Sequence, residues 1–285
     1  MIKPSFKIRS YLLVLLVTIS CQLVLFAQGN GITIEQRNNQ EAIALDKVTD
    51  LYNAKEYQLA FIELESIKDR RGDDNDAGLC YYQGLMLNKL NQYDQAVSRL
   101  NRAQQLDPTS AALYSELGYS YIGLQNFIQA IAMFNKHLES RPADKDSALK
   151  LSYCYYQNKN TKDAIGALTS FPFADVDIFF ALFNLYLEIN NTKKAHEVLE
   201  RILKISPDDE LALETLGKLY FNKLNDASAA VEVTTRLIEL QPDCGKYYYH
   251  RSVYYAKAGD SIRSKADLEE AGRRGYTSEN SYKEQ

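Results

Sequence analysis

The sequence of 285 residues contains no tryptophan and is poor in cysteine, proline and glycine. Four cysteines are too few for a disulfide-held scaffold of this length. Six prolines and 13 glycines provide few turns, which disfavours an all-β sandwich or barrel. The net charge of −4 lacks the basic excess of a nucleic-acid-binding protein, so we expect no nucleic-acid partner. With 46% hydrophobic and 25% charged residues, the composition is that of an ordinary folded protein.

Motifs for enzymatic chemistry are also missing. The three histidines are His137, His196 and His250, and no two of them have the i, i+4 spacing of a helical metal pair. The sequence holds no Cys-x-x-Cys, no glycine-rich phosphate loop and no Gly-x-Ser-x-Gly elbow. The acidic run 73–76 lacks the spaced glutamate of a calcium loop. We therefore expect no catalytic residue, no cofactor and no metal site, and hence no enzyme.

Residues 1–27 have the composition of a secretory signal. Basic residues precede an apolar stretch over residues 11–27, which ends with Ala27 before the polar Gln28. This stretch is shorter than the roughly 20 residues of a membrane-spanning helix, which favours cleavage after Ala27. Two alternatives stay open, namely an uncleaved anchor formed by residues 11–27 and a lipid attached to Cys21. All three predict export of the rest of the chain, with the periplasm as its compartment.

The predicted exported body is acidic. Without Lys3, Lys7 and Arg9 it keeps 30 basic and 37 acidic residues, a net charge of −7 that repels phosphate backbones and anionic lipid. We expect membrane contact only through residues 11–27 or a lipidated Cys21. Two of the three remaining cysteines, Cys80 and Cys154, lie among apolar residues, and we predict that they are small buried side chains.

A repeat with a period of 34 residues runs through most of the chain. An alanine followed by a proline 12 residues later recurs four times, at Ala96, Ala130, Ala195 and Ala230. Ahead of these alanines, glycine recurs with a large apolar residue three positions later, as in Gly84, Gly118 and Gly217. Such fixed periods are typical of repeat architectures.

Each recurring residue has a mechanical role in a helix–turn–helix unit. Leu117, Gly118 and Tyr121 share one helix face. Gly118 lets a second helix approach closely, although glycine inside a helix costs about 0.5–1 kcal/mol relative to alanine. Ala130 provides the matching small contact, Phe134 fills the interior, and a proline ends the second helix.

The sequence Leu-Gly-x-x-Tyr, followed by Ala-x-x-x-Phe and then Pro, resembles the tetratricopeptide repeat. The resemblance covers residues 41–276, flanked by a flexible linker over 28–40 and a disordered tail over 277–285. It implies an all-α, right-handed superhelical solenoid of about seven units. The expected unit starts are Glu41, Ala77, Ala111, Lys145, Val176, Glu210 and Gly245. The tryptophan usual early in the first helix is replaced by Cys80, Tyr114, Ala148, Phe179, Leu213 and Tyr248.

Three units depart from the pattern. In the fourth, the sequence Phe171-Pro172-Phe173 follows Ala164 closely, which predicts a short second helix and a local kink. In the sixth, the turn before Ala230 carries one extra residue. The first unit has Val48 and Gly72 in place of the glycine and the proline, and we expect it to act as a cap.

The resemblance also implies a function, because proteins of this family usually bind other proteins in a concave groove lined by their first helices. We therefore expect a protein-interaction scaffold that holds a peptide or protein segment in an aromatic groove. The candidate groove residues are Tyr52, Tyr81, Tyr119, Tyr153, Tyr156, Phe180, Phe221 and Tyr249. Two alternatives stay open: these rings pack against the neighbouring unit, or the chain is a membrane-tethered or lipid-anchored subunit of an envelope assembly. The lysine, asparagine and arginine set that grips a chaperone's terminal carboxylate is absent from the matching positions.

Overall fold

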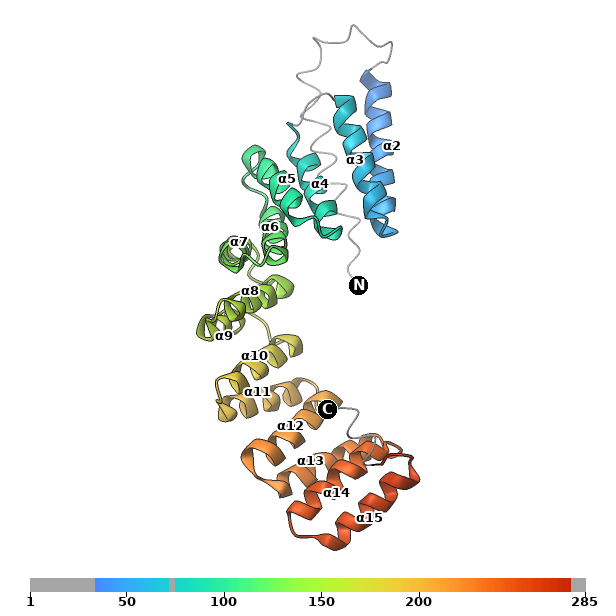
Figure 1. Cartoon of the computed structure of the whole chain (residues 1–285), viewed down its shortest axis with the longest axis vertical. Helices are drawn as coiled ribbons and strands as arrows, with labels where there is room; N and C mark the ends of the chain where they lie inside the picture. The colour runs from blue at the N-terminus through green and yellow to red at the C-terminus, as the bar shows by residue number, and fades with distance from the viewer. Residues whose placement is uncertain (1–33, 72–74, 278–285) are drawn as a thin grey trace. The chain divides into compact units, whose positions relative to one another are not determined.

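The computed structural model describes residues 34–71 and 75–277, with side chains from residue 42 onward, and every regular element in these ranges is a helix (Figure 1). The elements are α2 (Ile34–Asn53), α3 (Tyr57–Arg71), α4 (Ala77–Lys89), α5 (Tyr93–Leu106), α6 (Ala111–Gly123), α7 (Phe127–Ser140), α8 (Lys145–Gln157), α9 (Thr161–Thr169), α10 (Val176–Glu188), α11 (Thr192–Ile205), α12 (Glu210–Leu219), η1 (Tyr220–Leu224), α13 (Ala227–Leu240), α14 (Gly245–Lys257) and α15 (Ser261–Arg273). The predicted signal segment 1–27, Cys21, Gly72 and residues 278–285 lie outside the described residues.

These elements form seven helix pairs in the part of the chain that the structure describes, which confirms the all-α repeat fold. The first helices of the second to seventh pairs begin at the residues expected from the sequence. Helix α2 begins at Ile34, earlier than the start expected near Glu41, so the end of the predicted linker 28–40 is helical.

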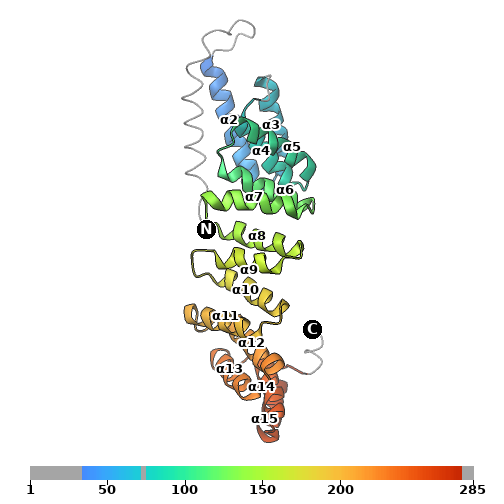
Figure 2. The ribbon, with the colours of Figure 1, turned by 90° about the vertical axis from the view of Figure 1, so that its left-hand side faces the viewer.

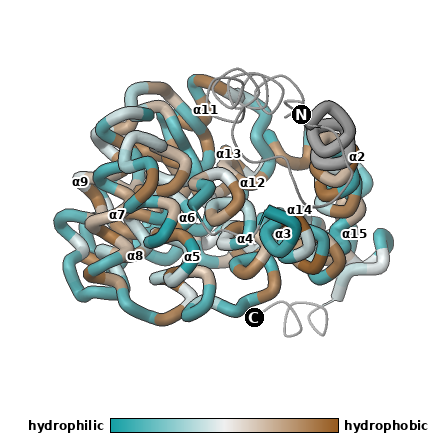
Figure 3. The backbone as a smooth tube through the Cα atoms, turned by 90° about the horizontal axis from the view of Figure 1, so that it is seen from above, coloured by the Kyte–Doolittle hydropathy of each residue, from teal (hydrophilic) through white to brown (hydrophobic). Residues whose placement is uncertain are grey.

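The pairs divide between two compact units, namely unit 1 with α2 to α5, which ends at Pro108, and unit 2 with α6 to α15, which begins at Thr109. In unit 1, Val48 of α2 packs with Leu64 of α3 and Met86 of α4. In unit 2, the largest apolar cluster runs from α8 to α12 and includes Leu182 and Leu199. Figure 2 follows the succession of pairs, and Figure 3 shows hydrophobic and hydrophilic stretches alternating along the helices.

The two helices of a pair approach each other through the recurring glycine, as predicted. A Cβ atom added at Gly118 would lie 2.7 Å from the ring of Phe134, a fully buried side chain. At Gly84 the same atom would lie 2.5 Å from Leu100 Cγ. Gly217 is less crowded, because Thr234 stands where the other pairs carry a larger side chain, and its Oγ1 lies 3.5 Å away.

Six of the seven described turns between paired helices share one hydrogen-bond geometry. In the third pair, Gln125 has a left-handed backbone with φ of 56°, and the amide of Asn126 donates to the Tyr121 carbonyl at 2.8 Å. The amide of Gln125 also donates to the Ile122 carbonyl, which completes a Schellman motif. The Asn126 side chain then caps α7 by accepting a bond from the Gln129 amide.

Two of the predicted departures have clear outcomes. Helix α9 has 9 residues whereas α7 has 14, which confirms the short second helix of the fourth pair. In the sixth pair the extra residue widens the end of the first helix into the π-helix η1. The Asp226 amide consequently reaches back to the Tyr220 carbonyl, one residue further than in the other turns.

Candidate functional site

The candidate groove residues differ in exposure. Tyr153 and Tyr156, both on α8, are 45% and 37% exposed, whereas the other six rings are half-buried. Tyr153 also packs edge-on against Phe127, the first residue of α7, with ring centroids 6.1 Å apart. The two exposed tyrosines are three residues apart and thus share one side of α8. They are the rings best placed to receive a partner.

Three half-buried candidate rings of unit 2 contact residues of the helices or segments that follow them in the chain. Tyr119 donates a hydrogen bond from its hydroxyl to Asp146 of α8, and its ring packs edge-on against Phe134. Phe221 lies 4.7 Å from Tyr254 of α14 between ring centroids. Tyr249 packs against Tyr276. These contacts agree with the alternative that some of the candidate rings pack between neighbouring helix pairs.

The other three candidates, Tyr52, Tyr81 and Phe180, pack against neighbouring aromatic or apolar side chains. In unit 1, Tyr52 packs against Tyr57, and Tyr81 packs against Tyr82 of the same helix. In unit 2, Phe180 is half-buried against the apolar cluster of α8 to α12. Within the described residues, no ring contact joins two of the eight candidates to each other. A partner would therefore meet separate rings, each held by its own neighbours.

An ionic cluster lies on the first helices at the other end of unit 2. Glu214 of α12 lies 2.6 Å from Lys218 Nζ and 3.0 Å from Lys246 Nζ of α14. Burial alone raises the pKa of Glu214, but the hydrogen bonds from the two lysines more than offset this and hold the pKa below its usual value. The lysine side chains of the cluster are 51% exposed at Lys218 and 27% exposed at Lys246.

Sequence reasoning did not predict this ionic cluster. The i, i+4 spacing of Glu214 and Lys218 is a signal for a helical ion pair. Nothing in the sequence places Lys246 beside them, because 32 residues separate it from Glu214.

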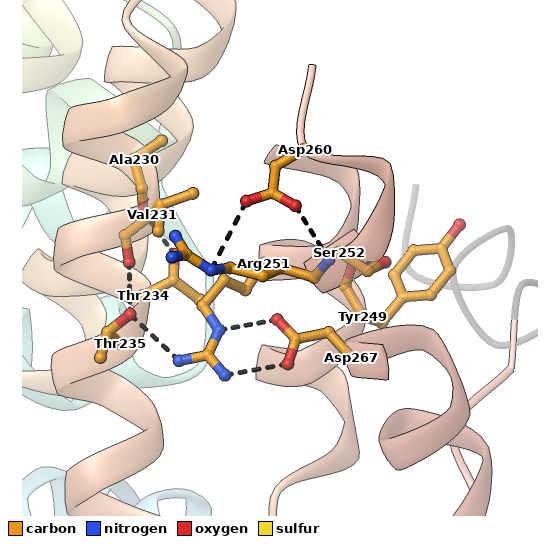
Figure 4. Close-up of polar contacts among 10 residues, drawn as sticks. Ala230, Val231, Thr234, Thr235, Tyr249, Arg251, Ser252, Asp260 and Asp267 are labelled. Carbon is orange, nitrogen blue, oxygen red and sulfur yellow. Dashed lines mark hydrogen bonds and ion pairs between the residues drawn. The ribbon is translucent and has the colours of Figure 1, made fainter. Parts of the chain in front are cut away.

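Helix α14 is held in place by a buried ion pair (Figure 4). Arg251 donates from Nε and Nη2 to Asp267 of α15 at 2.7 and 2.9 Å, and from Nη1 to Thr235 of α13 at 3.0 Å. The hydrogen bonds that Arg251 donates to Asp267 raise the pKa of Arg251, which keeps the guanidinium charged. This network fixes the helix that carries Lys246 and Tyr249.

A buried histidine joins three consecutive elements near the exposed tyrosines. His137 of α7 lies with Nδ1 2.8 Å from the Ala111 carbonyl and Nε2 2.7 Å from the Asp144 carboxylate. Asp144 also caps α8 by accepting a bond from the Ser147 amide. Burial raises the pKa of Asp144, but the bonds from His137 and Ser147 outweigh it and lower the pKa overall. His137 thus orients the start of α8.

The buried cysteines and the acidic residues of the described chain form no reactive or metal-binding site. Cys80 and Cys154 are buried, as predicted, and burial raises the pKa of Cys154 to about 11, which keeps the thiol protonated. Within residues 34–71 and 75–277, no three His, Cys, Asp or Glu side chains gather closely enough to hold a metal ion. None of the helices in these ranges has both the length and the hydrophobicity needed to cross a bilayer.

Comparisons with known proteins match two stretches of the chain to repeat families. A family described as "TPR repeat" matches residues 84–125, and one described as "Tetratricopeptide repeat" matches residues 115–174. Among curated proteins, the BBSome complex member BBS4 homolog of Drosophila melanogaster is 24% identical over 60% of this chain and 38% of its own length. The human Protein O-mannosyl-transferase TMTC3 is 24% identical over 78% of this chain and 24% of its own length. The chain thus spans less than two fifths of either relative.

Solved structures show the same fold. The C-terminal part of a TPR repeat-containing protein from Cytophaga hutchinsonii matches 79% of this chain and 93% of its own, with a TM-score of 0.68 and 16% identity. A tetratricopeptide repeat protein from Parabacteroides merdae matches 84% of this chain and 94% of its own, with a TM-score of 0.54 and 15% identity. The repeat matches place residues 84–174 in the tetratricopeptide repeat family, and the seven helix pairs share the fold of these solved structures.

Proposed function

We propose that the chain is a non-enzymatic scaffold for protein–protein interaction, exported to the cell envelope, which binds a peptide or protein segment along the first helices of unit 2. The observation that carries this proposal is the exposure of Tyr153 and Tyr156 side by side on α8. Tyrosine is enriched at binding hot spots because its ring buries a large area while its hydroxyl keeps a polar partner. One relative is named as a member of the BBSome complex, which is consistent with an assembly role.

The two exposed rings do not suffice for stable binding by themselves. Covering a large apolar side chain completely contributes roughly 1.5–3 kcal/mol, and both tyrosines are already more than half covered. Association costs an estimated 4–15 kcal/mol. The partner must therefore reach beyond α8, and Lys218, which has the same position on α12 as Tyr153 has on α8, offers a charged hydrogen-bond donor. We infer an extended guest that spans several pairs.

Paired variants test the proposed surface. In a pulldown from cells of the source organism, Tyr153→Ala with Tyr156→Ala should lose the captured partner while the helical circular dichroism signal stays unchanged. The matched control replaces Ile128 and Ile262 by alanine. These residues lie outside the first helices and are 67% and 84% exposed. Equal capture by both double variants would contradict the proposed surface.

The proposed export has its own test. The intact mass of the purified native protein should show the loss of residues 1–27 if the signal is cleaved after Ala27. Loss of the first 20 residues together with an added acyl mass would instead support a lipid-anchored subunit of an envelope assembly, attached through Cys21. An unprocessed mass in a soluble cytoplasmic fraction would contradict both.

A further inference from the structure

A cavity of about 380 Å³ opens between α7 and α9, with α8 as its floor. This volume lies within the usual range of small-molecule pockets. Leu138 of α7 forms one wall, Ala148 and Leu151 of α8 form the floor, and Gly166, Ala167 and Ser170 form the other wall. Gly166, Ala167 and Ser170, which directly follows α9, recur at the spacing of one helix face, so this part of the wall consists of small side chains. A Cβ atom at Gly166 would meet no atom within 4 Å.

Neighbouring pairs of unit 2 fill the equivalent space with their own side chains. In the third pair, Lys136 Nζ lies 5.4 Å from the ring centroid of Tyr114. In the fifth pair, Arg201 Cζ lies 4.3 Å from the centroid of Phe179. These separations are those of cation–π contacts. Each contact joins the fourth residue of the first helix to the residue six positions after the recurring alanine of the second helix.

The fourth pair lacks both members of this contact. Its fourth first-helix residue is Ala148, and the sixth residue after Ala164 is Ser170. Both residues line the cavity. The missing ring and the missing cation therefore explain why the space is open, and the neighbouring pairs show which groups fit it.

The lining adds a charge preference. Among the described residues that line the cavity, Asp163 is the one with a formal charge. Its Oδ2 accepts one hydrogen bond from Asn160 Nδ2 at 2.6 Å, and a carboxylate has further acceptor sites. A cation at the rim would thus meet a partly satisfied carboxylate, while the floor offers apolar contact.

We propose that this cavity binds an aromatic group that carries or adjoins a positive charge. Two sources share this chemistry, namely a free arylalkylamine and a peptide in which lysine or arginine follows an aromatic residue. In either case the ring takes the place of Tyr114 or Phe179 above Ala148, and the cation takes the place of Lys136 or Arg201 beside Ser170, with Asp163 about two helical turns further along the same wall. The site is separate from Tyr153 and Tyr156, so it stands independently of the function proposed above.

Nuclear magnetic resonance of the methyl-labelled full chain tests the proposal with named probes. Phenethylamine should shift the methyl signals of Leu138 and Leu151 saturably, with a dissociation constant on the order of 1 mM. Butylamine, which lacks the ring, should bind about tenfold more weakly or not at all. The peptides acetyl-Gly-Phe-Lys-Gly-amide and acetyl-Gly-Ala-Lys-Gly-amide form the second arm, and binding of only the first would identify a peptide source.

Variants separate occupation of the cavity from general surface binding. Ala148→Tyr with Ser170→Lys rebuilds the pair of α6 and α7 and should weaken phenethylamine binding at least about tenfold. Ser170→Lys alone, at an exposed position, covers the case in which the double variant does not fold. Ser228→Lys, at an exposed position of α13 outside the cavity lining, is the matched control and should bind as the unmodified chain does. No saturable shift with either phenethylamine or the aromatic peptide, equal binding of butylamine, or unchanged binding by both occluding variants would overturn the proposal.

Discussion

Replacing Gly118 by alanine tests how the paired helices fit together. Two opposing effects determine the result. Alanine is the better helix former by about 1 kcal/mol. The added Cβ atom, however, would lie 2.7–2.9 Å from three atoms of the Phe134 ring, which is fully buried and has no free space to enter. Overpacking of this kind typically costs 1–3 kcal/mol, and values in the upper part of that range are expected against a rigid ring.

Gly166 provides the matched control, because the same substitution there would place the Cβ atom in open space. Gly166→Ala should therefore stabilise the chain by about 0.5–1 kcal/mol. The free energy of unfolding of Gly118→Ala should lie about 1–3 kcal/mol below that of Gly166→Ala. Gly217→Ala should fall between them, since its Cβ atom would make an ordinary contact with Thr234.

Urea unfolding monitored by circular dichroism at neutral pH measures all three variants on the same chain. The slope of the free energy against urea should stay constant across the series, because the surface exposed on unfolding does not change. If Gly118→Ala were as stabilising as Gly166→Ala, the close approach of Gly118 to Phe134 would have no energetic weight. The explanation of the recurring glycine would then fail.

The remaining predictions concern a turn, a helix cap and an ion pair. Gln125→Gly should raise the free energy of unfolding by about 0.5–1 kcal/mol, because Gln125 has a φ of 56°, and Gly259→Ala at a φ of 84° should lower it by about 1 kcal/mol in the same urea experiment. The pKa of Asp144 is lower in the folded chain than in the unfolded chain, so its carboxylate stabilises the fold above the unfolded pKa. This contribution disappears as the pH falls through the folded pKa. The stability difference between the native chain and Asp144→Asn should therefore shrink below about pH 4. Arg251→Ala leaves Asp267 buried without its cation and should cost roughly 3 kcal/mol in thermal or urea unfolding, whereas a loss below about 0.5 kcal/mol would show that the pair behaves like an exposed one.

Much of the fold follows from local features of the sequence. The recurring glycines, alanines and prolines predict where six of the seven first helices begin, because each has a steric role that does not depend on distant residues. The short α9 follows from Pro172 and the residues around it for the same reason. The early start of α2 at Ile34 could not be predicted, since residues 34–40 carry no apolar repeat.

The candidate site was less predictable, because exposure depends on neighbouring helices. Tyr119 and Tyr153 occupy the same position of consecutive first helices, yet Tyr119 is half-buried and Tyr153 is exposed. Tyr119 donates a hydrogen bond to Asp146 and has Lys150 over its ring, whereas Asp177, at the same position of α10 as Asp146 on α8, pairs with Lys145. The cavity beside α9 likewise could not be predicted from the sequence, although Ala148 is one of the residues that replace the usual tryptophan. Its significance depends on a partner 22 residues away, at Ser170.

The sixth turn shows how the array absorbs a change in length. Its additional residue is taken up by one widened helical turn at Tyr220–Leu224. Beyond it, Asp226 still caps α13 and Ala230 is still fully buried, so the downstream register is unaffected. Insertions and deletions of single residues should therefore accumulate in the links between paired helices as such chains diverge during evolution. An alignment that assumes a rigid period would misplace every later repeat.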